Sequence, residues 1–125
     1  MTDRELYERA VAVGGRAYAP YSRFRVGAAV LLRSGGVVTG VNVENASYPL
    51  GMCAERSALA RAVAEGARPG EIETVAVTAS PCGGCRQWLL ELRVGRVVFA
   101  RGGELLVRTP EELLPDSFEL APERA

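Results

Sequence analysis

Three cysteines carry the chemistry that this sequence could perform. Cys82 and Cys85 stand three residues apart at the start of an expected helix, so their sulfur atoms share one helix face. Cys53 stands at the start of another expected helix, and the positive end of a helix dipole stabilises a thiolate. Three thiolates without a histidine or a fourth cysteine match the ligand count of catalytic zinc, where water takes the fourth position.

Three other interpretations of these cysteines remain open on spacing alone. A lone Cys-x-x-Cys pair is often a thioredoxin-like redox site, although that leaves Cys53 without a role. Free cysteines are also common in packed cores. A structural zinc site is the third alternative, with Glu55 as the fourth ligand. Glu55 favours the catalytic alternative, because a carboxylate two residues from a zinc ligand can transfer the protons that hydrolysis requires.

Composition narrows the class of protein. The 125 residues, 48% hydrophobic and 24% charged, fit one globular domain over 1–125, with a loose charged tail at 119–125. The absence of histidine excludes Ser-His-Asp and Cys-His catalysis. A net charge of zero argues against a nucleic-acid partner. The arginines are scattered along the chain and are not interleaved with aromatic residues, so an RNA-binding protein is the least favoured hypothesis. The longest uncharged apolar stretch, residues 26–32, is too short to span a bilayer.

The number of cysteines and the first residues of the chain bear on the cellular compartment of the protein. The first six residues contain two acids and no apolar run, which is unlike a secretory signal. Three cysteines cannot all pair within one chain. We therefore expect a cytoplasmic protein without a membrane partner.

The expected order of elements is αββαβαββ, followed by a short helix after Pro110. Apolar spacing predicts helices at 3–18, 53–65 and 80–92, the last with Ser80 as N-cap and Pro81 in its first turn. Residues 45–51 are expected to form a loop. Only four residues, 101–104, join the last two strands, so these strands must form an antiparallel hairpin. Alternation and apolar runs predict strands at 24–32, 37–43, 72–79, 96–100 and 105–108. The fold class is α/β: a three-layer α-β-α sandwich with a mixed five-stranded sheet.

Four motifs occur in a fixed order along the chain. They are Arg-Phe-Arg-Val-Gly-Ala-Ala at 23–29, Asn-Val-Glu-Asn-Ala-Ser at 42–47, Cys-Ala-Glu-Arg at 53–56 and Ser-Pro-Cys-Gly-Gly-Cys-Arg-Gln at 80–87. Zinc deaminases carry a His/Cys-x-Glu motif followed by Pro-Cys-x-x-Cys. Over residues 21–118 the chain resembles the small homotetrameric zinc-dependent cytidine deaminases.

The resemblance implies a reaction and its machinery. Cytidine and deoxycytidine would be hydrolysed to uridine and deoxyuridine with release of ammonia, as in pyrimidine salvage. One Zn²⁺ per subunit would be held by Cys53, Cys82 and Cys85. Glu55 would carry a proton from water to the pyrimidine ring nitrogen. Arg56, three residues after Cys53, could offset the thiolate charge, although an exposed cation is the alternative.

The resemblance also implies substrate contacts. Phe24 would pack on the pyrimidine, and backbone near Ala54 and Cys82 would orient the base. Asn42 and Glu44 would bind the ribose, since alternation puts both on one side of an extended segment and Asn45 on the other. In a homotetramer with shared active sites, Tyr48 and Phe118 would complete a neighbour's site. Trp88 would lie in the core or at a subunit interface.

Substrate class within the superfamily is a separate question, because related deaminases act on tRNA, DNA or free bases. The tight hairpin at Gly102-Gly103 resembles the nucleoside branch. Glu44 near the ribose would repel a phosphate, which favours nucleosides over monophosphates. Blasticidin-type deaminases are close relatives, but residues 42–47 match the cytidine motif better. A structural-zinc or redox interaction module is the alternative from another class.

Overall fold

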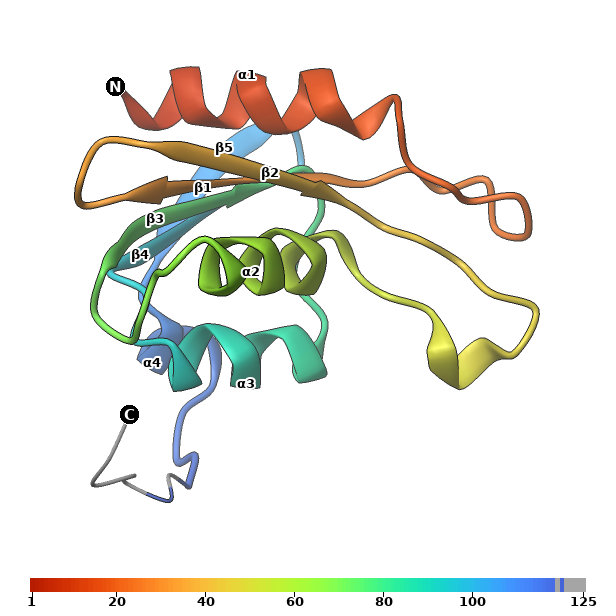
Figure 1. The fold of residues 1–125 in the computed structure, drawn as a ribbon. Coiled ribbons are helices and arrows are strands. Elements are labelled where there is room, and N and C mark those ends of the chain that lie inside the picture. Colours follow the sequence, from red (N-terminus) through yellow and green to blue (C-terminus); the bar gives the residue numbers. More distant parts are fainter. Residues whose placement is uncertain (119, 121–125) are drawn as a thin grey trace.

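The computed structural model describes residues 1–118 and 120. The order of helices and strands along this part of the chain agrees with the order that the sequence predicts (Figure 1). The elements are α1 (Asp3–Gly14), β1 (Gly27–Leu32), β2 (Val37–Val41), the 3-10 turn η1 (Tyr48–Leu50), α2 (Ala54–Ala64), β3 (Ile72–Val77), α3 (Gly83–Glu91), β4 (Arg96–Arg101), β5 (Glu104–Arg108) and α4 (Pro110–Leu113).

The five strands form one mixed sheet in the order β2-β1-β3-β4-β5. β3 and β4 run parallel, whereas the pairs β1–β2, β1–β3 and β4–β5 are antiparallel. The expected hairpin of the last two strands is therefore confirmed. β3 lies at the sheet centre, as its apolar density predicts, and its last three residues are completely buried.

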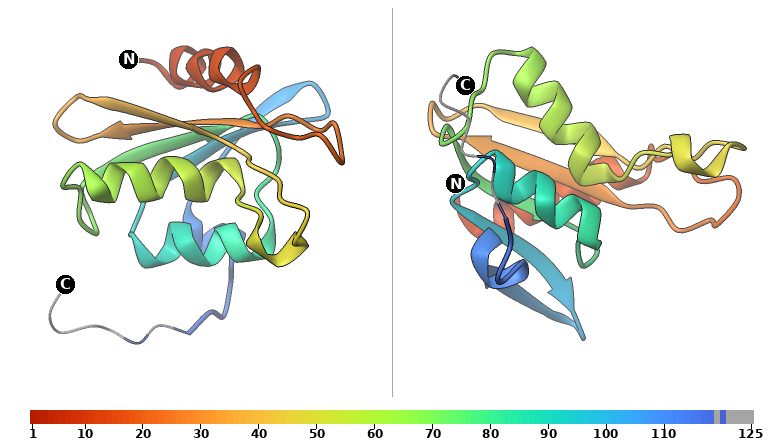
Figure 2. Two further views of the ribbon diagram at one scale, coloured as in Figure 1. Left: turned by 45° about the vertical axis from the view of Figure 1, so that its right-hand side comes forward. Right: turned by 90° about the horizontal axis from the view of Figure 1, so that it is seen from below.

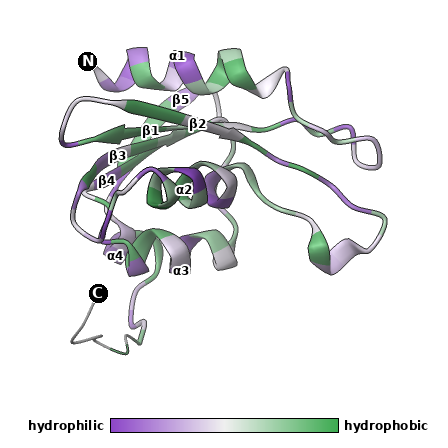
Figure 3. Ribbon diagram, in the orientation of Figure 1, coloured by the Kyte–Doolittle hydropathy of each residue, from purple (hydrophilic) through white to green (hydrophobic). Residues whose placement is uncertain are grey.

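Helices cover both faces of the sheet, which confirms the three-layer α-β-α sandwich. α1 lies on one face, and α2 and α3 lie side by side on the other (Figures 1 and 2). Figure 3 shows the apolar residues concentrated in the strands, between helices of mixed character. Two buried clusters result, a smaller one beneath α1 and a larger one beneath α2 and α3.

Two glycines allow the helices to approach the sheet closely. A Cβ atom on Gly27 would lie 2.0 Å from the Ala10 carbonyl oxygen of α1. On Gly40 it would lie 2.4 Å from the Ala58 nitrogen of α2. Either substitution would push a helix away from its strand. The position of α2, which follows Cys53, thus depends on direct contact with β2.

Several expected boundaries are wrong, and the reasons are local. α1 ends at Gly14 instead of residue 18, because the Tyr18 N–H donates to the Asn42 carbonyl at 3.0 Å and leads the chain away. β1 begins at Gly27 instead of residue 24, because the Asn42 side chain binds the Val26 N–H at 2.8 Å in place of a strand partner. β2 and β3 end two residues earlier than expected, at Val41 and Val77.

Two further expectations about local structure need correction. α3 begins at Gly83 with Cys82, not Ser80, as its extended N-cap residue, so Pro81 lies outside the helix. The loop at 45–51 contains the 3-10 turn η1. In the described residues, no helix is both long and apolar enough to cross a bilayer. The expectation of a loose tail at 119–125 falls outside the described residues except for the exposed Leu120, and the domain boundaries stay a prediction.

Candidate functional site

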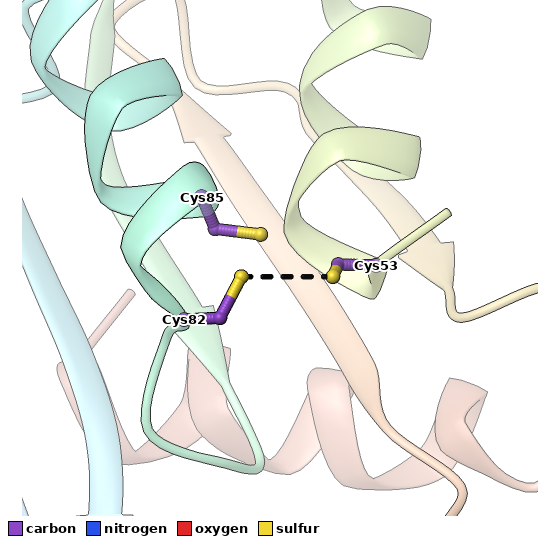
Figure 4. A group of neighbouring side chains, drawn as sticks. All are labelled: Cys53, Cys82 and Cys85. Carbon is purple, nitrogen blue, oxygen red and sulfur yellow. Dashed lines mark hydrogen bonds between the residues drawn. The ribbon is translucent and has the colours of Figure 1, made fainter. Parts of the chain in front are cut away.

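The three cysteine sulfur atoms meet where the N-termini of α2 and α3 face each other (Figure 4). Cys53 precedes α2, Cys82 precedes α3, and Cys85 lies in the first turn of α3. The Sγ atoms of Cys53 and Cys82 are 3.9 Å apart, and all three Sγ atoms lie within 4.8 Å of one another. Residues 29 positions apart in sequence are thus brought together by the packing of two helices on one sheet face.

This donor set fits a zinc ion with one position left open. Zn–S bonds of about 2.3 Å in tetrahedral geometry place neighbouring sulfurs about 3.8 Å apart. The observed separation of 3.9 Å agrees with that value. All three cysteines are free, and in the described residues they are the one group of this kind that could hold a metal ion.

The pKa values of the three thiols shift in different directions. Burial raises the pKa of the Cys85 and Cys53 thiols. Partial burial also acts to raise the pKa of Cys82, but hydrogen bonds from the Cys85 and Gly84 N–H groups and from the neighbouring thiols outweigh it, so this pKa is lowered. Cys82 is therefore the thiol most readily deprotonated for metal binding, and loading the site with a cation releases protons.

Glu55 lies beside the sulfur group on the first turn of α2. Its side chain is almost fully buried, with 4% exposure. Burial raises the pKa of its carboxyl above the ordinary value. A carboxyl group with a raised pKa holds a proton more readily than an ordinary carboxylate, which favours a role in general acid–base catalysis.

Arg56 contacts the sulfur group directly. Its Nη2 donates to Cys53 Sγ at 3.9 Å and to the Gly51 carbonyl oxygen at 3.3 Å. Three thiolates and one Zn²⁺ carry a net charge of −1, and a guanidinium on one sulfur offsets it. The alternative of an exposed cation for Arg56 disagrees with this half-buried, sulfur-bound position.

A cleft of about 650 Å³ leads from Cys53, Cys82 and Arg56 along the segment 42–52. This volume is in the range of pockets that bind small molecules. Asn42, Glu44 and Tyr48 line the cleft, together with Asn45, Tyr21 and Ser22. The Asn45 side chain accepts a hydrogen bond from the Ser47 N–H at 2.9 Å, beyond the end of β2 at Val41. The expectation that it points away from Asn42 and Glu44 stays a prediction.

Asn42 and Glu44 also bind the neighbouring segment 21–26. Asn42 Nδ2 donates to the Phe24 carbonyl oxygen at 2.9 Å, while Oδ1 accepts from Val26. The Glu44 carboxylate accepts from the N–H groups of Tyr21 at 2.9 Å and Ser22 at 3.1 Å and from the Ser22 hydroxyl. The Ser22 hydrogen bond lowers the pKa of Glu44, so its carboxyl stays ionised.

Ser22 is a residue that sequence reasoning missed. Its Oγ donates to Glu44 and accepts from the Phe24 N–H at 3.0 Å, so one hydroxyl joins the two segments that border the cleft. A serine two residues before a backbone N–H forms a common local turn, but its link to Glu44 spans 22 positions and has no signal in sequence.

Of the remaining predicted residues, Phe24 and Phe118 do not converge on the cleft within this chain. Phe24 and Phe118 are exposed and are not among the residues lining the cleft, while Tyr48 lines it with 91% of its surface exposed. Ala54 is buried and is not among the residues lining the cleft. Trp88 on α3 is 38% exposed, which excludes the core alternative within this chain.

Comparison with known proteins shows which family the chain belongs to. Residues 1–101 match the family model described as the cytidine and deoxycytidylate deaminase zinc-binding region. The chain belongs to this deaminase family. The zinc-binding site that defines the family accords with the three-sulfur group of the structure.

Individual relatives of the deaminase agree with this assignment. A cytidine deaminase from Halalkalibacterium halodurans is 44% identical, over 93% of this chain and 94% of its own. One from Mycobacterium tuberculosis is 43% identical, over 83% of this chain and 80% of its own. The crystal structure of the Burkholderia pseudomallei cytidine deaminase superposes with a TM-score of 0.88 at 47% identity, covering 94% of this chain and all of that one.

Proposed function

We propose that this deaminase hydrolyses cytidine and deoxycytidine to uridine and deoxyuridine with release of ammonia, in pyrimidine salvage. The observation that carries the proposal is the placement of three sulfur atoms within 4.8 Å of one another at one end of a cleft, beside the buried Glu55. The names and coverage of the relatives support the substrate class.

Cys53, Cys82 and Cys85 would hold one zinc ion per chain. Zinc supplies Lewis acidity, which makes a water-derived nucleophile available near neutral pH. Glu55 would accept a proton from that water at a carboxylate oxygen and donate it to the pyrimidine ring nitrogen, then assist the departure of ammonia. Its raised pKa supports the second half of this cycle, because the carboxyl can hold the proton until the base needs it. Arg56 would offset the negative charge of the thiolates.

Asn42 and Glu44 would bind the ribose from the cleft wall. In the structure one amide hydrogen of Asn42 has no partner among the described residues, and the Glu44 carboxylate keeps acceptor capacity beyond its three hydrogen bonds. An ionised Glu44 would repel a phosphate, so nucleosides would be preferred over monophosphates. Phe24 would pack on the pyrimidine, and backbone groups near Ala54 and Cys82 would orient it.

A homotetramer would complete the site in the cytoplasm. Tyr48 and Phe118 expose 91% and 71% of their surface. Large aromatic side chains that remain this exposed in one chain often mark a surface that another protein chain covers. Both would reach a neighbouring subunit's cleft. The partly exposed Trp88 of α3 would lie at a subunit interface.

The test is absorbance during incubation with cytidine, deoxycytidine, cytosine and the cytidine and deoxycytidine monophosphates. We expect turnover of the two nucleosides, and its loss in Glu55→Ala with zinc still bound. Glu65→Ala, on the exposed end of the same helix, is the matched control. Preferred turnover of a monophosphate would overturn the ribose-side role of Glu44. No turnover of any of these compounds by zinc-loaded protein would overturn the proposed reaction.

A further inference from the structure

The segment that supplies Cys82 is weakly held by its own residues. Cys82, Gly83 and Gly84 are exposed, and a Cβ atom on either glycine would have no neighbour within 4 Å. Because two consecutive glycines disfavour a helix, the first turn of α3 needs an external contact to keep one conformation.

Arg86 supplies that contact through three different nitrogen atoms. Its Nε donates to the Pro81 carbonyl oxygen at 2.9 Å, its Nη2 to the Ser80 hydroxyl at 3.3 Å, and its Nη1 to the Leu113 carbonyl oxygen at 2.9 Å. A planar guanidinium can serve three acceptors at once in this way. The side chain therefore joins the turn before α3 to the end of α4.

The backbone of Arg86 acts on the same turn. Its N–H donates to the Cys82 carbonyl oxygen at 3.0 Å, in the first helical hydrogen bond of α3. Since the side chain binds the carbonyl of Pro81, the peptide groups on both sides of Cys82 are bound by one residue. The direction of the Cys82 side chain depends on these two peptide planes.

We propose that Arg86 is a positioning residue that holds Cys82 at metal-binding distance from Cys53. The inference rests on the metal site of the proposed function. Arg86 differs from Arg56, because its side-chain bonds all go to oxygen atoms, whereas Arg56 contacts a sulfur atom. The contribution of Arg86 is accordingly geometric, and a lysine that keeps the charge cannot replace it.

The experiment compares Arg86→Lys and Ser80→Ala with the wild-type chain and with Arg61→Lys. Arg61 is an exposed arginine paired with Glu65 on α2, so it controls for an arginine-to-lysine change on a helix. The measurements are the rate of zinc transfer to a coloured chelator and the melting temperature with and without zinc. We expect zinc release about tenfold faster or more in Arg86→Lys, a smaller increase in Ser80→Ala and none in Arg61→Lys. The zinc-induced rise in melting temperature shrinks in the same order.

A purely structural role of Arg86 gives a different pattern. Melting temperatures with and without zinc then fall equally in Arg86→Lys while zinc release stays at the wild-type rate, and the proposal is wrong. If Arg86→Lys does not fold, Ser80→Ala decides, because it removes one contact of an exposed residue, and wild-type release there overturns the proposal. Wild-type protein that binds no zinc would instead overturn the metal site itself.

Discussion

The sulfur group and the loop side of the cleft are built in opposite ways. The first lies at the N-termini of two helices that pack on the sheet, with Cys85 and Glu55 buried. The second consists of the segments 18–26 and 42–52, which extend together beyond the sheet and expose Tyr21, Phe24 and Tyr48 (Figure 2). The groups proposed for the reaction thus lie on packed helices, and the groups proposed for substrate recognition lie on loops.

The two regions are also held in place by different kinds of contact. Helix packing on an apolar core positions the cysteines, whereas side-chain hydrogen bonds to backbone position Asn42 and Glu44. A single exposed hydrogen bond of this kind contributes only about 1 kcal/mol. Changes in the first region should therefore abolish the chemistry, and changes in the second should weaken substrate binding while the chemistry persists.

The largest effect is expected from Cys85→Ser, which removes the fully buried thiol of the sulfur group. Two sulfurs are too few for the site, so bound zinc is lost and kcat/KM falls by roughly a thousandfold or more. Zinc content per chain and initial rates with cytidine measure this. A variant that keeps both full zinc and full activity would show that Cys85 is a packing residue.

Arg56→Ala comes next. Loss of the guanidinium leaves the thiolate charge uncompensated, and we expect kcat/KM to fall about 10- to 100-fold with little change in the free energy of unfolding. Arg56→Lys should recover part of the activity. Urea unfolding alongside steady-state kinetics makes the comparison, and equal losses of activity and stability would contradict the role.

Ser22→Ala tests the recognition side. Without the hydroxyl, Glu44 and the Phe24 backbone lose their shared partner, and KM for cytidine should rise about fivefold to tenfold with kcat nearly unchanged. Ser22→Thr should restore the wild-type KM. Ser34→Ala, in the distant turn between β1 and β2, is the control. A fall in kcat at constant KM would place Ser22 in the chemistry instead.

We expect a smaller effect of pH on ligand affinity, through the ionisation of Glu44. Because its folded pKa is lowered, its hydrogen bonds stabilise the loop above the ordinary carboxyl pKa and are lost as pH falls through the lower folded value. Affinity for uridine as a competitive inhibitor should stay constant down to about pH 5 and weaken only at more acid pH. In Ser22→Ala the weakening should begin at higher pH. An inhibition constant that rises between about pH 7 and about pH 5 in wild-type protein would contradict this.

Thr2→Ala should have the least effect on function, because α1 covers the sheet face opposite the site. Thr2 and Glu5 form a capping box at the start of α1. Loss of the cap should lower the free energy of unfolding by about 1 kcal/mol and leave KM and kcat unchanged. Urea unfolding and cytidine kinetics measure both. A change in KM would show that the two faces are coupled.

Local rules were sufficient for several features of this protein. The i, i+3 spacing of Cys82 and Cys85 and the four-residue connection before β5 act over one helical turn or one hairpin, and the structure agrees with both. The apolar density of β3 likewise indicated a central strand. The errors lie at ends of elements, where contacts distant in sequence compete with local preference, as with Asn42 and the start of β1.

The residue types, the Cys-x-x-Cys spacing and the motif order came from the sequence by itself, because they depend only on neighbours along the chain. The meeting of Cys53 with Cys82, the burial that raises the pKa of Glu55, and the bonds from Ser22 to Glu44 and from Arg86 to Leu113 were decided by tertiary structure alone. The physical reason is that each contact depends on which helices and loops lie on the same face or edge of the sheet. Residues far apart in sequence meet there, and no local pattern in the sequence indicates that they do.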